Sequence, residues 1–149
     1  MEFLTELGFI GLFISAFLAA TILPLSSEIV LSTLLISDTQ LFSPIPLIIT
    51  ATAGNVLGSL LNYYLGRSYG RHAIKHWLKI SDRSMANAEQ RFHQYGLASL
   101  CFAWVPIIGD PLTVIAGLLR VNIVWFIVLV GVGKLLRYLT VSYIILQAV

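Results

Sequence analysis

Four ionisable residues interrupt otherwise apolar stretches of the sequence and are the first candidates for chemistry: Glu28, Asp110, Lys134 and Arg137. If those stretches lie in a bilayer, each charge near the bilayer centre costs about 2.5 to 3.5 kcal/mol on insertion scales. Charged residues at that depth are therefore expected to be paired, hydrated or functional. Because two of the four are acids and two are bases, we predict that their side chains meet in one polar cluster.

The residue types in this cluster suit the binding of an anion. Lys134 and Arg137 are three residues apart and so occupy neighbouring positions on one helical face. The guanidinium of Arg137 offers a planar fork for phosphate and Lys134 a point charge beside it, which together are expected to hold an anionic lipid headgroup. Glu28 is expected to exchange a proton in each cycle, and Asp110 either does the same or is the resting partner of the bases. The alternative is a pair of salt bridges that only holds the protein together.

Three neutral polar residues in another apolar stretch complete the candidate site: Asn55, Ser59 and Asn62. Their spacings of four and three residues place them on one face of a helix. We predict that their amides and hydroxyl are hydrated or hydrogen-bonded to the charged cluster. Polar packing between helices, without a role in binding, is the alternative.

The composition indicates a membrane protein. Of the 149 residues, 58% are hydrophobic and 11% are charged, and the mean hydropathy is +0.89; soluble domains carry about a quarter charged residues. The net charge of +2 and the clustering of basic residues in one segment argue against nucleic-acid binding. His72 and His76 lie one turn apart, but no third ligand has suitable spacing, so we expect no metal site and no cofactor.

Four apolar stretches are long enough to enter a membrane: residues 7–37, 41–66, 95–119 and 121–149. A spanning helix needs about 20 residues, so residues 46–66 and 122–147 each fit one crossing. The first and third stretches are too long for one crossing and too short for two, and we predict that they are re-entrant hairpins. The breaks are expected at Pro24 in one hairpin and at Pro106, Gly109 and Pro111 in the other. The alternative is two kinked single spans.

The sequence also repeats. Pro24 and Glu28 have the same spacing as Pro106 and Asp110, and residues 58–63, Gly-Ser-Leu-Leu-Asn-Tyr, echo residues 133–138, Gly-Lys-Leu-Leu-Arg-Tyr. A duplicated unit of hairpin plus helix, with the two long helices crossing in opposite directions, is an inverted repeat. We therefore predict an all-α integral membrane protein with a single membrane domain over residues 1–149. Its first repeat covers about residues 7–66, its linker about 67–94 and its second repeat about 95–149.

The linker sets the expected orientation. Six of the nine basic residues lie within residues 67–94, and the positive-inside rule places such a segment in the cytoplasm. We expect it to form a basic amphipathic segment on the anionic leaflet, with Ile74, Trp77 and Leu78 turned inward.

Several short motifs occur in a set order: Pro24-x-x-x-Glu28, Gly54-x-x-x-Gly58, Asn62-Tyr63-Tyr64-Leu65-Gly66-Arg67-x-x-Gly70, Phe92-x-x-Tyr95-Gly96, Val105-Pro106 and Ala116-Gly117. Over nearly the whole chain this order resembles the DedA family, also called the SNARE-associated or VTT-domain family, and in particular its small YqaA-type branch. The resemblance implies inverted re-entrant hairpins in the bacterial inner membrane. It also implies proton-coupled movement of a phospholipid or a polyprenyl phosphate carrier lipid, with Glu28 as the family's hairpin glutamate.

Two motifs of that family are altered in this chain. Ser59 follows Gly58 where many members have aspartate, and residues 103–109 lack both arginines of the family's Arg-Phe-x-Pro-x-x-Arg motif. We expect Lys134 and Arg137 to supply the positive charge from another element, and Asp110 to supply the second acid.

The expected partners are therefore membrane lipids and protons, and the expected protein is a transporter, not an enzyme. Ser26 and Ser27 lie beside Glu28, but no histidine lies at membrane depth to activate a serine nucleophile. A structural or assembly role, and behind it a membrane-embedded enzyme, are the alternatives. A homo-oligomer is left open.

Overall fold

The computed structural model describes residues 2–21, 27–37, 43–77, 81–105 and 109–148, and within these residues the chain is helical with no strand. The α-helices are α1 (Glu2–Thr21), α2 (Ser27–Ser37), α3 (Pro44–Trp77), α4 (Asp82–Tyr95), α5 (Gly109–Leu118) and α6 (Ile123–Ala148), and a 3-10 helix, η1, covers Gly96–Trp104. The predicted breaks at Pro24 and Pro106 lie outside the described residues.

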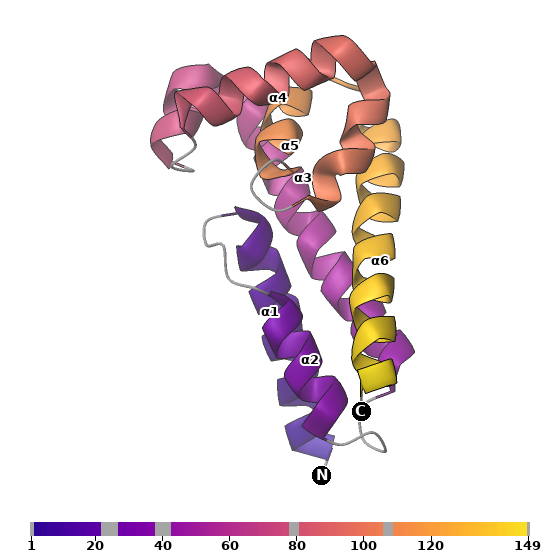
Figure 1. Ribbon diagram of the computed structural model, residues 1–149. Coiled ribbons are helices and arrows are strands. Elements are labelled where there is room, and N and C mark those ends of the chain that lie inside the picture. Colours follow the sequence, from indigo (N-terminus) through magenta and orange to yellow (C-terminus); the bar gives the residue numbers. More distant parts are fainter. Residues whose placement is uncertain (1, 22–26, 38–42, 78–80, 106–108, 149) are drawn as a thin grey trace.

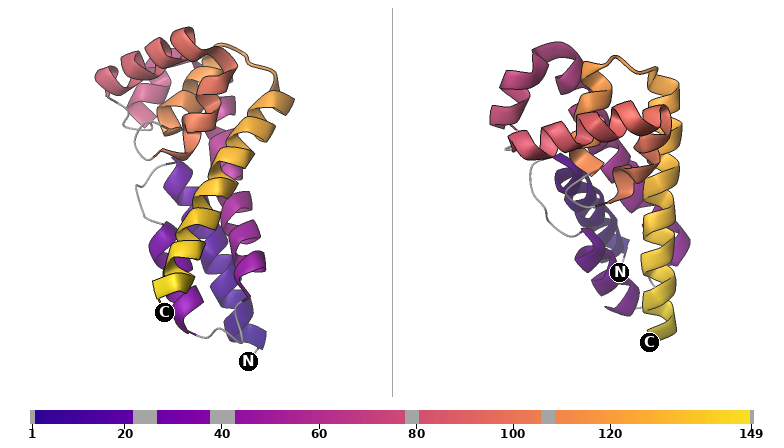
Figure 2. Two further views of the ribbon diagram at one scale, coloured as in Figure 1. Left: turned by 45° about the vertical axis from the view of Figure 1, so that its right-hand side comes forward. Right: turned by 45° about the horizontal axis from the view of Figure 1, so that its top comes forward.

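The helices form two short pairs beside two long helices (Figures 1 and 2). Helices α1 and α2 lie side by side and run in opposite directions at one end of the molecule, while η1 and α5 do the same at the other end. Both pairs pack against α3 and α6. We call α1 with α2 the first hairpin, and η1 with α5 the second hairpin.

Among the described residues, two helices are long and apolar enough to cross a membrane, over Pro44–Gly70 and Ile123–Ala148. The first contains the span predicted from the sequence at residues 46–66, and the second covers the span predicted at residues 122–147 from residue 123 onward. The helical part of α3 continues past the predicted span, with a kink at Gly70, where φ is 72° and ψ is 172°.

The segment between the hairpins, predicted as an amphipathic linker, is mostly helical. In α4 the hydroxyl of Ser81 accepts a hydrogen bond from the Ser84 backbone N–H, which caps the first turn. Met85 and Ala88 on α4 are buried against the apolar side chains of α5. His72, His76 and His93 are exposed, whereas the side chains of Ile74, Trp77 and Leu78 lie outside the described residues.

Glycines let the long helices approach both hairpins closely. A Cβ added at Gly58 of α3 would lie 2.6 Å from the Phe17 carbonyl oxygen of α1, and one at Gly133 of α6 would lie 2.9 Å from the Cys101 carbonyl oxygen of η1. A Cβ at Gly117 of α5 would lie 2.0 Å from the Tyr63 carbonyl oxygen. A Cβ at Gly54 would lie 2.5 Å from the Phe13 carbonyl oxygen of α1, so the Gly54 and Gly58 pair lets α1 and α3 approach closely.

Gly58→Ala is expected to lower the midpoint of thermal unfolding in detergent. Alanine forms helix better than glycine by about 1 kcal/mol, but its Cβ would overlap the α1 backbone, and overpacking costs about 1 to 3 kcal/mol. Gly131→Ala on α6 is the matched control, because a Cβ there meets nothing within 4 Å. That control should match or exceed the parent midpoint, and equal midpoints for both variants would contradict the close packing.

Candidate functional site

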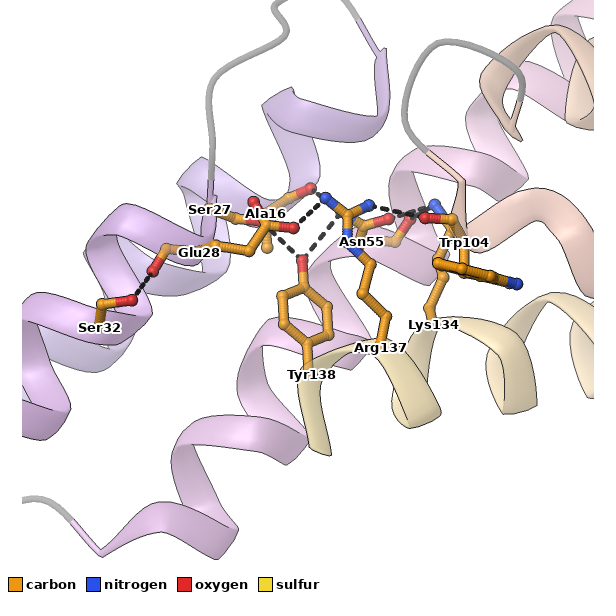
Figure 3. A network of polar contacts seen from close by, with 9 residues as sticks. All are labelled: Ala16, Ser27, Glu28, Ser32, Asn55, Trp104, Lys134, Arg137 and Tyr138. Atoms are coloured by element: carbon orange, nitrogen blue, oxygen red, sulfur yellow. Dashed lines mark hydrogen bonds and ion pairs between the residues drawn. The ribbon is translucent and has the colours of Figure 1, made fainter. Parts of the chain in front are cut away.

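An ion pair joins the second arm of the first hairpin to α6. The Nη2 atom of Arg137 contacts Oε1 of Glu28, and the two side chains are 22% and 19% exposed. Arg137 also donates from Nη1 to the Trp104 carbonyl oxygen, at 3.1 Å, in the last turn of η1. Glu28 lies in the first turn of α2, where the helix dipole favours a carboxylate. Arg137 therefore connects both hairpins at the place where they approach each other (Figure 3).

Lys134 lies about 60° around α6 from Arg137 and is buried, with 2% of its surface exposed. Its ammonium donates to Oδ1 of Asn55 on α3, and to the Asn55 carbonyl oxygen at 3.4 Å. In the part of the chain that the structure describes, no carboxylate lies within ion-pair distance of this ammonium. Lys134 is therefore a buried cation held by neutral oxygens.

Tyr138 extends this network to the first hairpin. It is fully buried, and its hydroxyl lies 3.0 Å from Nδ2 of Asn55 and 2.7 Å from Oγ of Ser27. Asn55 Nδ2 also donates to the Ala16 carbonyl oxygen of α1, at 3.1 Å. These groups belong to α1, α2, α3 and α6, and Figure 3 shows them close together. Tyr138 was not among the residues predicted for the site, although it ends one of the two matching hexapeptides.

The remaining predicted site residues lie near this network without joining it. Asp110, in the first turn of α5, is partly buried and interacts electrostatically with Lys134 and Arg137, but it makes no ion pair within the described residues. Ser59 is buried and donates to the carbonyl oxygen of Asn55 in its own helix, at 3.1 Å.

Asn62 is hydrogen-bonded to both hairpins. It donates to the Ala20 carbonyl oxygen at 2.7 Å and to Oγ1 of Thr113 at 3.2 Å. Gly109 and Pro111, the described members of the predicted break, are buried at the start of α5. Proline is tolerated in this first turn, where its missing N–H has no helical partner.

Contacts made by α3 and α6 match in pairs. Asn62 and Arg137 hold the same position in the two hexapeptides. Asn62 donates to the Ala20 carbonyl oxygen in the last turn of α1 and contacts Thr113 of α5. Arg137 donates to the Trp104 carbonyl oxygen in the last turn of η1 and contacts Glu28 of α2. Each residue therefore contacts the first arm of one hairpin and the second arm of the other. The same hexapeptides end in the two fully buried tyrosines, Tyr63 and Tyr138.

A cavity of about 690 Å³ opens beside the ion pair. Glu28 and Arg137 supply its charged groups and Thr140 a hydroxyl, and the rest of its wall is apolar. The apolar wall comes from Cys101 and Trp104 of η1 and from Val132, Gly133, Leu136 and Val141 of α6. A charged end and an apolar wall are suited to an amphiphile.

Comparison with known proteins places this geometry in a family. A family model described as the VTT domain matches residues 23–147. The chain is 37% identical over 139 residues to inner membrane protein YqaA of Escherichia coli (strain K12), covering 91% of this chain and 89% of that protein. It is 36% identical over 138 residues to an uncharacterised protein of Haemophilus influenzae, covering 89% and 84%.

A more distant relative carries a functional name. The chain is 28% identical over 141 residues to undecaprenyl phosphate transporter A of Staphylococcus aureus, covering 89% of this chain and 70% of that protein. No solved structure matches the chain.

Proposed function

The chain belongs to the VTT-domain family, also called the DedA family, and is a bacterial inner membrane protein; from this premise we propose that it moves a phosphate-bearing lipid across the bilayer, coupled to protons. The observation that carries the proposal is the position of Arg137 at the charged end of an apolar cavity. The name of the staphylococcal relative, an undecaprenyl phosphate transporter, supports the same class of substrate.

The cavity and its neighbours offer what a lipid phosphate requires. A guanidinium has five N–H donors, and Arg137 uses two of its nitrogens, towards Glu28 and Trp104, so donors remain for phosphate oxygens. An apolar chain would lie against Trp104 and Leu136. Lys134 adds a second positive charge, and among the described residues it makes no ion pair with a carboxylate. This arrangement favours an anion on an apolar chain over a free inorganic ion.

Competition between two anions gives a way to couple transport to protons. Glu28 and a lipid phosphate would both bind the Arg137 guanidinium, so protonation of Glu28 would release the guanidinium to the phosphate. Binding of the lipid and uptake of the proton would then favour each other, as linkage requires. Asp110 provides a second carboxylate in the electrostatic range of both bases.

We further infer that the chain is one membrane domain made of two inverted units, each a re-entrant hairpin with one long helix. The opposite directions of the hairpins and the matched contacts of Asn62 and Arg137 support this inference. The basic segment of residues 67–94 lies in the cytoplasm on this account. Alternating access would then consist of one unit moving against the other around the site.

Cys101 provides a direct test, because it is the single cysteine of the chain and lines the cavity. Farnesyl phosphate at ten times its Kd is expected to slow alkylation of Cys101 by about tenfold if the bound lipid covers the thiol. Inorganic phosphate, which lacks the chain, should leave the rate unchanged. Mass spectrometry of the alkylated protein in detergent measures both rates.

The control places the thiol elsewhere. In a Cys101→Ser, Leu119→Cys protein the thiol lies at an exposed position outside the cavity lining, and its alkylation should not respond to farnesyl phosphate. An unchanged rate at Cys101 with saturating farnesyl phosphate would contradict the proposal that the cavity holds a lipid chain.

A further inference from the structure

Tyr138 lies at the junction of three helices that carry the site. Its hydroxyl is hydrogen-bonded to Asn55 of α3 and to Ser27 of α2, and Asn55 in turn accepts a hydrogen bond from Lys134. All four residues are at least 95% buried. Water therefore does not compete for these bonds, and each polar group depends on its partner in the network.

The directions of the hydrogen bonds made by the Asn55 amide follow from the chemistry of the groups. The amide of Asn55 must present Oδ1 to the Lys134 ammonium and Nδ2 to the Ala16 carbonyl, because the opposite orientation would face donor with donor and acceptor with acceptor. Nδ2 then donates to the Tyr138 hydroxyl. That hydroxyl also shares a hydrogen bond with the Ser27 hydroxyl, in which either oxygen can be the donor.

Lys134 thus helps to fix the orientation of the Asn55 amide, which donates to the Tyr138 hydroxyl. This hydroxyl is hydrogen-bonded to Ser27 in the first turn of α2, the second arm of the first hairpin. Ser27 is followed directly by Glu28, which pairs with Arg137. If the ammonium moves from Asn55 to another anion, Oδ1 of Asn55 loses its donor in a buried place. The amide is then held in this orientation by the Ala16 carbonyl alone, and the hydrogen bonds that run through Tyr138 to Ser27 are weakened.

We propose that Tyr138 is a positioning residue that ties the Lys134 ammonium to the first hairpin, so that engagement of Lys134 by a phosphate releases the Ser27–Glu28 turn. The proposal rests on the proposed function only in naming a lipid phosphate as the anion. The tie between Lys134 and the hairpin is a property of the hydrogen-bond network and can be tested without any ligand.

Tyr63 shows what distinguishes Tyr138. It is also fully buried, ends the matching hexapeptide of α3, and donates its hydroxyl proton to the Val121 carbonyl oxygen. A backbone carbonyl cannot reorient as a side-chain amide or hydroxyl can. Tyr63 is therefore a fixed anchor, and Tyr63→Phe is the matched control for Tyr138→Phe.

The experiment measures the distance between the first hairpin and α6 in the full chain. Spin labels are attached at Ser37→Cys, the end of α2, and at Gln147→Cys, near the end of α6, in a Cys101→Ser background. Both positions are exposed. The distance distribution is recorded for the parent, Tyr138→Phe and Tyr63→Phe, each with and without Lys134→Gln.

The measurement without ligand tests whether Lys134 is linked to the first hairpin through Tyr138. Lys134→Gln removes the ammonium and is expected to shift the distance distribution in the parent and in Tyr63→Phe, but not in Tyr138→Phe. An equal shift in Tyr138→Phe would show that Lys134 does not act through Tyr138 and would overturn the inference. Ser27→Ala removes the other end of the same bond and must behave as Tyr138→Phe does, which keeps the test decisive if one variant does not fold.

The ligand arm adds farnesyl phosphate to the same proteins. The distance distribution is expected to shift in the parent and in Tyr63→Phe, but not in Tyr138→Phe. The Kd of Tyr138→Phe for the lipid is expected to change by less than about fivefold, which is the lower end of the usual range for energetic coupling between two sites. If the parent does not bind farnesyl phosphate, the proposed function fails while the ligand-free arm still decides the role of Tyr138. If all proteins bind and shift alike, the proposed function stands and Tyr138 has no positioning role.

Discussion

Arg137→Leu is expected to abolish binding of farnesyl phosphate and to lower the free energy of unfolding by about 1 to 3 kcal/mol. The first effect follows because the guanidinium is the cavity's cationic group. The second follows because Glu28 and the Trp104 carbonyl lose their shared donor, and an unsatisfied buried partner costs about that much. Equilibrium binding and chemical denaturation in detergent measure the two effects.

Two further variants separate charge from geometry. Arg137→Lys keeps the charge but loses the planar fork, so binding should weaken by about tenfold, equivalent to roughly 1.4 kcal/mol. Arg137→Leu combined with Glu28→Leu removes both charges of the ion pair and should recover stability without recovering binding. If this double variant binds and transports as the parent does, the ion pair is only structural.

Glu28→Gln is expected to retain lipid binding while losing most of the turnover and the part of the pH dependence due to Glu28. In the parent, affinity should fall as the pH rises, because ionised Glu28 takes the Arg137 guanidinium from the phosphate. Glutamine resembles the protonated acid in shape but carries no exchangeable charge. The variant should therefore keep the high affinity of the parent at low pH over the whole range.

Binding measured from pH 5 to 8 on both proteins isolates this effect, since titration of the lipid phosphate itself is common to both. Glu6→Gln serves as the control, because Glu6 is an exposed carboxylate on α1 outside the site. The same pH profile for Glu28→Gln and the parent would exclude Glu28 as the proton-sensitive group.

The sequence predicted the long helices well because their apolar length is close to a membrane thickness. The span predicted at residues 46–66 lies within α3, and helix continues beyond it to a kink at Gly70 and on to Trp77. The pattern reports where apolar burial ends, whereas backbone hydrogen bonds can extend a helix into water. The 3-10 geometry of η1 could not be predicted, because residues 97–104 form an apolar run without a periodic pattern.

The polar site was only partly predictable. The cost of buried charge identified Glu28, Lys134 and Arg137, but could not tell which would bond to which. Residues three apart on a helix differ in direction by about 60°, and this difference sends Arg137 to Glu28 and Lys134 to Asn55. The Trp104 carbonyl has no side-chain signature. Tyr138 could have been found, because it occupies the position of Tyr63 in the repeated hexapeptide.

Transbilayer movement of a labelled polyprenyl phosphate in vesicles that contain the pure protein tests the central claim most directly. We expect the parent to accelerate movement between leaflets, more strongly when a pH gradient is imposed, and Arg137→Leu to behave as protein-free vesicles do. Glu28→Gln should show little response to the gradient. Equal rates for the parent, Arg137→Leu and protein-free vesicles would contradict the account and leave the ion pair a structural feature of the fold.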